Sequence, residues 1–175
     1  MLMLRIIPLI IAAVISGADE TQEAPITVRT VTPENAATAR AWTEDEEEAA
    51  RYIAKTLYGE CRGCTQTEQA AVVWCILNRV DSDERYFPDD IVSVITQKYQ
   101  FAGYREKNPV TAELLGMAYD VMFRWLAEKD GETNSGRVLP AEYCYFVGDG
   151  KHNYFTAVWR GSDYWNWTLE TPYEN

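Results

Sequence analysis

The chain has little positive charge, and this scarcity argues against one large class of partners. Its 175 residues carry 16 lysine and arginine side chains against 27 aspartates and glutamates, a formal net charge of −11 at pH 7. A nucleic-acid-binding domain normally presents a basic face to the phosphate backbone, so no nucleic-acid partner is expected. The same acidity gives no long-range attraction to an anionic polymer, which would have to be bound through local hydrogen bonds and aromatic contacts.

Histidine and cysteine are too sparse for an evident metal site. His152 is the only histidine, and Cys61 and Cys64 form a Cys-x-x-Cys with no second pair at zinc-finger spacing. We therefore expect neither a metal nor another cofactor. With Cys75 and Cys144 the chain has four cysteines, which allow three disulfide pairings or four free thiols, and the sequence does not choose among them.

The apolar run near the amino end is too short for an ordinary transmembrane helix. It covers the ten residues Ile6–Ile15, whereas a spanning helix needs roughly 20. Arg5 precedes the run and Ser16-Gly17-Ala18 follows it, which is the pattern of a signal peptide over residues 1–18. We therefore expect export, with no stable membrane insertion after cleavage; retention as an N-terminal anchor is the alternative.

The rest of the chain divides into an arm and one domain. Residues 19–41 are rich in Thr, Glu, Ala and Pro without a strong period, which predicts a flexible arm with at most a short strand over 26–28. Residues 42–175 are expected to form an α+β domain, mostly helical. Its first two helices are predicted from capping boxes at Thr43–Glu46 and Thr65–Glu68.

The spacing of apolar residues and the positions of Gly and Pro predict the bounds of the remaining elements. The first helix should run to about Leu57, where Gly59 can end it, and the second to about Val80. A short third helix follows Pro88, and Asn108-Pro109 opens the fourth and longest. Near the carboxyl end, aromatic and β-branched residues, which favour strands, become frequent. The segments Tyr143–Val147 and Tyr154–Trp159, with a Gly-containing loop between them, predict a small hairpin.

The segment Tyr58-Gly59-Glu60-Cys61-Arg62-Gly63 holds one glutamate in a Gly-flanked turn between the first two predicted helices. Such a carboxyl group, fixed at a helix end, can serve as the general acid that cleaves a glycosidic bond. An isolated glutamate between helices is more often a solvated surface residue. The wider pattern is what favours catalysis at Glu60.

That pattern is an ordered series of short motifs. After the Glu60 segment come Gln69–Val73, Leu77-Asn78-Arg79-Val80, Arg85–Asp89, Ile91–Ile95 and Gln100-Phe101. Together these closely resemble the SleB/CwlJ family of cell-wall hydrolases, from about Ala49 to Phe101. The segment Gly148–Phe155, which contains His152, is a weaker echo of the family's Gly-x-His-x-Phe segment.

The resemblance implies a lysozyme-like fold, a location outside the cell or at its wall, and the glycan strands of peptidoglycan as substrate. Family members are often lytic transglycosylases, with Glu60 in the catalytic position here. The resemblance also implies a cleft position for Gln100, Phe101 and His152. Gln100 would hydrogen-bond an N-acetyl group and Phe101 would offer the sugar a flat face; an ordinary loop glutamine and a core phenylalanine are the alternatives.

A raised pKa at Glu60 is required for the acid role, and Tyr58 is the nearest apolar candidate to raise it. Arg62 beside Glu60 would instead lower that pKa, so a structural contact for Arg62 is equally compatible. A hydrolase more commonly uses two carboxylates. Glu68 is better explained as the second member of its capping box, which favours a one-carboxylate transglycosylase.

Two further functions stay open. The chain departs from the family pattern at Cys61, where Ala is usual, and a Cys61–Cys64 disulfide in an exported protein would stiffen the Glu60 turn. One alternative is a catalytically silent wall-binding or assembly module of the same fold. The other is a cysteine peptidase or amidase that uses Cys64 at a helix start with His152. Asn78 and Arg79 are expected to stabilise a helix end, and His152 between strands is most often structural.

Overall fold

The computed structural model describes residues 40–173, and every structural statement below concerns them. These residues belong to one compact unit. The predicted signal peptide over 1–18, the arm as far as residue 39 and the strand predicted over 26–28 lie outside the described residues. Within the described range, no helix is long and apolar enough to cross a membrane.

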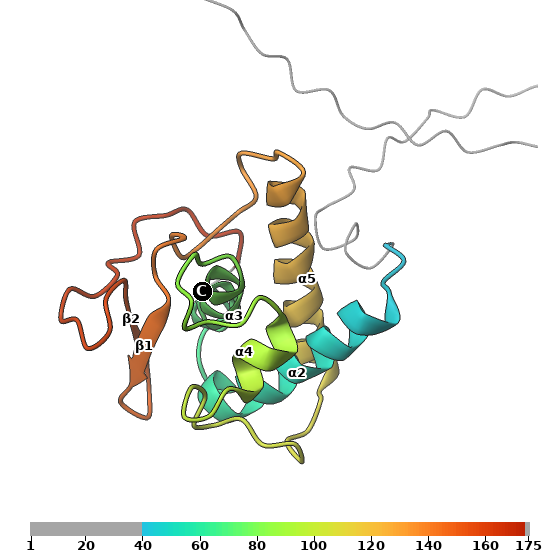
Figure 1. Ribbon diagram of the computed structural model, residues 1–175, viewed down its shortest axis with the longest axis horizontal. Coiled ribbons are helices and arrows are strands. Elements are labelled where there is room, and N and C mark those ends of the chain that lie inside the picture. Colours follow the sequence, from blue (N-terminus) through green and yellow to red (C-terminus); the bar gives the residue numbers. More distant parts are fainter. Residues whose placement is uncertain (1–39, 174–175) are drawn as a thin grey trace, which may run out of the picture. The chain divides into compact units, whose positions relative to one another are not determined.

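Helices dominate the described part of the chain, and one hairpin accompanies them (Figure 1). The helices are α2 (Glu44–Cys61), α3 (Gln66–Val80), α4 (Ile91–Thr96) and α5 (Ala112–Lys129). The strands β1 (Tyr145–Gly148) and β2 (Asn153–Thr156) pair antiparallel. The predicted class, α+β and mostly helical with a small carboxyl-terminal β element, is confirmed.

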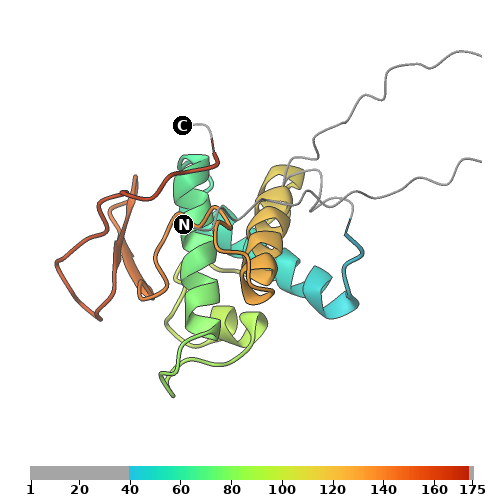
Figure 2. The same cartoon turned by 90° about the horizontal axis from the view of Figure 1, so that it is seen from above.

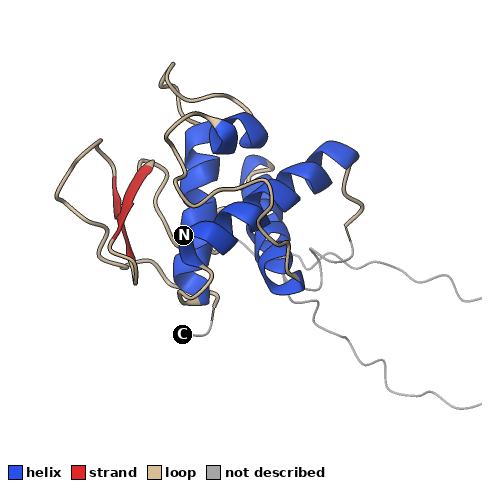
Figure 3. Ribbon diagram, turned by 90° about the horizontal axis from the view of Figure 1, so that it is seen from below, coloured by secondary structure: helices blue, strands red, loops and turns tan. Residues whose placement is uncertain are grey.

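Helix α3 is the central element of the fold. Nearly all of its side chains are buried, including Trp74, Ile76 and Leu77, each with no exposed surface. It lies between the hairpin and α5, as the two views in Figures 2 and 3 agree in showing. A helix that is apolar on all sides is typical of such a position, because every face meets another element.

Helix α2 begins as predicted but ends later. Thr43 and Glu46 form the complete capping box, with the Thr43 hydroxyl accepting from the Glu46 N–H at 3.2 Å. Gly59 does not end the helix, which continues through Glu60 to Cys61. An ideal Cβ at Gly59 would lie 1.9 Å from the carbonyl oxygen of Gly103, so this position serves close backbone packing rather than helix termination.

Helices α4 and α5 each start about three residues later than predicted. Asp90 caps α4, and its carboxylate accepts from the Ser93 N–H at 2.8 Å. Thr111 caps α5, accepting from the Leu114 N–H at 3.3 Å. Asn108, the predicted cap, uses its side-chain amide elsewhere and donates to two backbone carbonyls of neighbouring segments. The Thr111 hydroxyl, rather than the Asn108 side chain, therefore caps α5.

Candidate active site

Glu60 lies in the last turn of α2, against the loop that follows Phe101. Its Oε1 accepts a hydrogen bond from the Gly103 N–H at 2.6 Å. Among the residues that the structure describes, none donates to its second oxygen, Oε2. One oxygen is thus fixed by the backbone, while the other is free to meet an incoming group.

The electrostatic surroundings of Glu60 favour the protonated acid. Burial raises the pKa of its carboxyl above the usual value. The Gly103 N–H lowers it, as do the more distant charges of Arg105 and Arg79, but burial is the largest effect. Arg62 is not among the charges that shift this pKa. A half-buried carboxyl that keeps its proton to higher pH has the property required of a general acid.

Two glycines make this arrangement sterically feasible. Added Cβ atoms at Gly59 and Gly103 would each lie within 2.5 Å of backbone atoms of the other segment. No side chain fits between these segments, so glycine at both positions lets the loop N–H reach the Glu60 carboxylate. Gln69 stabilises the end of α2, because its buried amide donates to the Cys61 carbonyl at 3.2 Å.

Arg79 lies beside the candidate site residues Gln100 and Phe101, in a position that was not foreseen from the sequence. Its side chain is buried, and its Nε donates to the Cys144 carbonyl at 2.7 Å. Its Nη1 donates to Gln100 Oε1 at 3.2 Å, and its guanidinium carbon lies 4.7 Å from the centroid of the Phe101 ring. Arg79 lies in the last turn of α3, as expected, and its side chain also links α3 to the hairpin and to the Gln100-Phe101 pair.

Asn78 also makes contacts far from its own helix. Its amide donates to the carbonyls of Pro140 and Tyr143 at 2.8 and 3.0 Å, which ties α3 to the segment leading into β1. Both residues belong to the Leu77–Val80 motif, and this was the available signal for them. The motif alone did not show that the carbonyl groups they bind lie more than sixty positions along the chain.

Gln100 and Phe101 lie together, but their surroundings differ. Gln100 is half-buried, and its amide donates to the Tyr86 hydroxyl at 2.7 Å, so Arg79, Gln100 and Tyr86 form one chain of hydrogen bonds. Phe101 is only 6% exposed and packs against Phe146, with ring centroids 6.0 Å apart. Little of its ring is left for a sugar, and its observed environment is that of the core.

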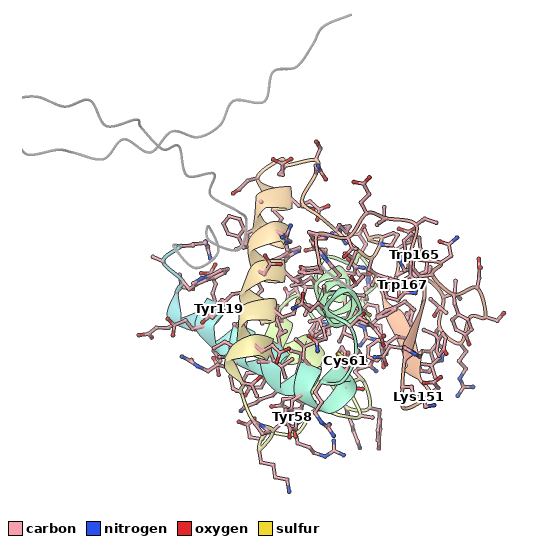
Figure 4. All side chains as sticks on the ribbon, turned by 180° about the vertical axis from the view of Figure 1, so that it is seen from behind. Tyr58, Cys61, Tyr119, Lys151, Trp165 and Trp167 are labelled. Atoms are coloured by element: carbon pink, nitrogen blue, oxygen red, sulfur yellow. The ribbon has the colours of Figure 1, made fainter. Side chains whose placement is uncertain are left out.

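Tyr58 and Arg62 contact each other rather than Glu60. The Arg62 Nη1 donates to the Tyr58 carbonyl at 3.0 Å, and the guanidinium carbon lies 5.0 Å from the centre of the Tyr58 ring. Arg62 therefore makes a structural contact at the end of α2, which is one of the two alternatives left open. Figure 4 shows Tyr58 and Cys61 near this end of the helix.

His152 belongs to a second polar cluster. Its Nδ1 lies 3.3 Å from Glu68 Oε2, and no hydrogen bond joins it to Glu60. Glu68 does not complete the predicted capping box. Thr65 still caps α3, but the Glu68 carboxylate accepts from the N–H and the side-chain amide of Asn153, at 2.6 and 3.2 Å. The Glu68 carboxylate does not bind the backbone of Thr65 because it accepts from Asn153 in β2 instead.

All four cysteines are free thiols in this structure. The neighbouring Cys64 thiol, followed by burial, raises the pKa of Cys61, and burial raises the pKa of Cys144 to about 12. The Cys64 thiol faces the Lys151 carbonyl at 3.7 Å, while the His152 imidazole faces Glu68. Cys64 and His152 are thus not arranged as a nucleophile and its base. Among the described residues, no three His, Cys, Asp or Glu side chains are grouped to hold a metal ion.

Comparison with protein families gives a match that covers most of the chain. The family model described as Cell Wall Hydrolase matches residues 63–171, beginning three positions after Glu60. No curated protein and no solved structure matches. The chain therefore belongs to the cell wall hydrolase family, and the resemblance to the SleB/CwlJ type is confirmed. Its substrate class is peptidoglycan, and its place of action is outside the cell or at the wall.

Proposed function

We propose that this cell wall hydrolase is a lytic transglycosylase that cleaves the bond between N-acetylmuramic acid and N-acetylglucosamine, with Glu60 as its single catalytic residue. The observation that carries the proposal is the Glu60 carboxyl itself. It is half-buried, its pKa is raised, one oxygen is fixed by Gly103, and the other is unengaged by described residues.

The chemistry needs one carboxyl that acts twice. Glu60 first donates its proton to the glycosidic oxygen as the bond from C1 of N-acetylmuramic acid to that oxygen breaks. The resulting carboxylate then takes the proton of the C6 hydroxyl of the same ring, and the C6 oxygen bonds to C1. The product is a 1,6-anhydro ring, no water is consumed, and Glu60 ends protonated as it began.

Among the described residues, no carboxylate charge contributes to the pKa shift of Glu60, so no second acid is seen to act on it. Glu68 is the nearest acid in sequence that is also buried, and its carboxylate is engaged with Asn153 and His152. An inverting hydrolase would need a carboxylate able to activate a water, and a retaining one would need a nucleophile about 5 Å from the acid. The engagement of Glu68 with β2 favours the one-carboxylate route.

We propose that the substrate contacts Gln100 and Tyr86, which Arg79 links in one chain of hydrogen bonds. Gln100 and Tyr86 offer polar groups, and the Tyr86 ring is 58% exposed. These groups are suited to an N-acetyl side chain and a sugar face, respectively. Tyr58 and Phe101 would contribute by shaping the apolar surroundings of the site. His152 belongs to the separate Glu68 cluster.

The deciding experiment is a digest of purified peptidoglycan with the protein and with its Glu60→Gln variant, analysed by mass spectrometry. We expect anhydro-muropeptides, one water lighter than hydrolytic products, from the parent and none from the variant. Reducing-end products that require Glu60 would instead establish hydrolysis through a second group. If no product depends on Glu60 on several wall types, the protein is a silent binding module or uses peptide-bond chemistry.

Export through residues 1–18 is proposed on the sequence pattern alone, with residues 19–41 as an arm before the catalytic domain at 42–175. The test is amino-terminal sequencing of the protein recovered outside expressing cells. A new terminus at Asp19 supports cleavage after Ala18. An intact Met1 on membrane-bound protein would instead indicate the anchor.

A further inference from the structure

A cavity of about 380 Å³ lies beside the Glu68 cluster, apart from the contacts of Glu60. Its wall combines the start of α3, the start of β2 and the carboxyl-terminal segment, and Glu60 is not among the residues that line it. Figure 4 shows Trp167 of that segment near the hairpin whose turn carries Lys151. The volume falls within the range typical of sites for small molecules.

The cavity contains a carboxylate that is almost completely removed from solvent. The Glu68 side chain is 6% exposed. Its Oε1 is occupied by the two donors of Asn153, whereas Oε2 has only His152 Nδ1, at 3.3 Å. A carboxylate offers about four acceptor sites, so Oε2 keeps capacity for a donor brought by a ligand. The His152 side chain is 63% exposed at the same edge of the cavity. Its second ring nitrogen, Nε2, can hydrogen-bond a ligand there.

Apolar surface borders these polar groups. Trp167 is 43% exposed and is held by an edge-to-face contact with Phe155, at a centroid distance of 5.8 Å and an angle of 87°. Leu169, also partly exposed, lines the same cavity. An aromatic face beside hydrogen-bonding groups suits a pyranose, because a sugar ring has an apolar face of C–H groups and a rim of hydroxyls.

The charge of the cavity lining indicates which component of the wall it can bind. Among the described residues, no lysine or arginine lines the cavity, and Glu68 is the one acid that does. An anionic group would meet an uncompensated carboxylate in a protein that already carries a net charge of −11. Stem peptides, which are attached through the lactyl group of N-acetylmuramic acid, carry free carboxylates, whereas N-acetylglucosamine is neutral.

We propose that this cavity is a second glycan-binding site that takes a neutral pyranose of the N-acetylglucosamine type. It would hold the protein on a glycan strand while Glu60 acts elsewhere on it. The inference rests on the glycan substrate of the proposed function, but not on which reaction Glu60 performs.

The test uses the full chain carrying Glu60→Gln, which prevents cleavage during the measurement. Oligomers of N-acetylglucosamine, which are neutral and carry no lactyl or peptide group, are titrated while the tryptophan indole N–H signals are followed by NMR. We expect the Trp167 indole signal to shift with saturation. Trp167→Ala should weaken binding about two- to tenfold, the range for one aromatic contact.

A matched control is Tyr99→Ala in the same background, since Tyr99 is 87% exposed and does not line this cavity. It should bind the oligomers like its parent, and thermal melting should show both variants folded. Equal loss in both variants, unchanged binding by Trp167→Ala, or absence of saturable binding would each overturn the proposal. So would displacement of the oligomer by a free stem peptide.

Failure of the proposed function gives a different result. If the digest shows no product that depends on Glu60 but the Trp167 signal still saturates with the oligomers, the glycosidase proposal fails and the second site stands. If Glu60-dependent products appear but the Trp167 signal does not respond, only the second site fails.

Discussion

At the scale of single residues, Glu60 carries a stability cost that is linked to its proposed role. Burial raises the pKa of its carboxyl, so the folded protein holds the proton at pH values where the unfolded chain has released it. Within the window that begins near the ordinary glutamate value of 4.5 and extends upward, the native state therefore binds more protons than the unfolded state. The contribution of Glu60 to stability is greatest below this window and falls as the pH rises through it.

The Glu60→Gln variant should therefore gain stability relative to the parent as the pH rises. Gln does not titrate, and its carbonyl oxygen can still accept from the Gly103 N–H. We expect the free energy of unfolding of the variant, minus that of the parent, to be more positive at pH 7 than at pH 4. Urea unfolding at the two pH values measures it, with exposed Glu113→Gln as a control. A difference that falls with pH would mean that the native site favours the charged carboxylate.

At the scale of elements, the α2 end and the following loop are joined through a glycine pair. Gly59 lies inside a helix, yet an added Cβ would overlap the Gly103 carbonyl at 1.9 Å. Gly116, inside α5, has nothing within 4 Å of an added Cβ. The two helical glycines thus separate the effect of helix propensity from that of steric overlap.

Gly59→Ala should destabilise the protein and abolish wall cleavage, because the loop must move and Glu60 loses its Gly103 contact. We expect a loss of at least 1 kcal/mol, typical of overpacking at about 1–3 kcal/mol. Gly116→Ala should instead stabilise by up to about 1 kcal/mol. Thermal or urea unfolding measures both. Equal effects of the two substitutions would show that the Gly59–Gly103 approach is not required.

The hairpin is anchored to α3 by the Glu68 carboxylate. Removing that carboxylate leaves the buried Asn153 N–H without its acceptor at 2.6 Å. The loss of one buried partner typically costs about 1–3 kcal/mol. Glu113 also lies in the first turn of its helix, but its side chain is exposed.

Glu68→Ala should therefore lower the free energy of unfolding by about 1–3 kcal/mol. Glu113→Ala should change it by no more than about 1 kcal/mol, through the helix dipole alone. Urea unfolding compares the two, and hydrogen exchange of the β2 amides shows where protection is lost. If Glu68→Ala costs no more than Glu113→Ala, the contact with β2 contributes little to stability.

At the scale of the whole molecule, net charge sets how the protein approaches its substrate. With a formal net charge of −11 it is repelled by an anionic wall at long range. Screening weakens this repulsion, because the Debye length falls from about 30 Å at 0.01 M salt to about 8 Å at 0.15 M. Binding must come from short-range contacts, which salt affects much less.

Co-sedimentation of the Glu60→Gln protein with insoluble peptidoglycan should therefore increase when salt is raised from about 10 to 150 mM. A basic protein of similar size, such as a commercial lysozyme, should show the opposite trend in the same assay. Binding that decreases with salt would indicate a local basic surface that outweighs the net charge.

The position of the site in the chain could be predicted, but its contacts could not. The Glu60 segment, the family resemblance, the capping of α2 and the hairpin all follow from short-range patterns. The prediction for Gly59 was wrong because a helical glycine can serve either helix termination or close packing, and only the loop at Gly103 decides. Arg79 was missed for a similar reason, since its role depends on Cys144 and Gln100.

The sequence by itself determined the composition class, the family, the helical segments and the glutamate at the end of α2. These depend on residues within a few positions of one another, where helix and strand periodicities act directly. Only the tertiary structure decided which group binds Glu60, 43 positions away, and which strand receives Glu68, 85 positions away. Those pairings depend on how the whole core packs, because a buried carboxylate accepts whichever donor the fold brings within reach.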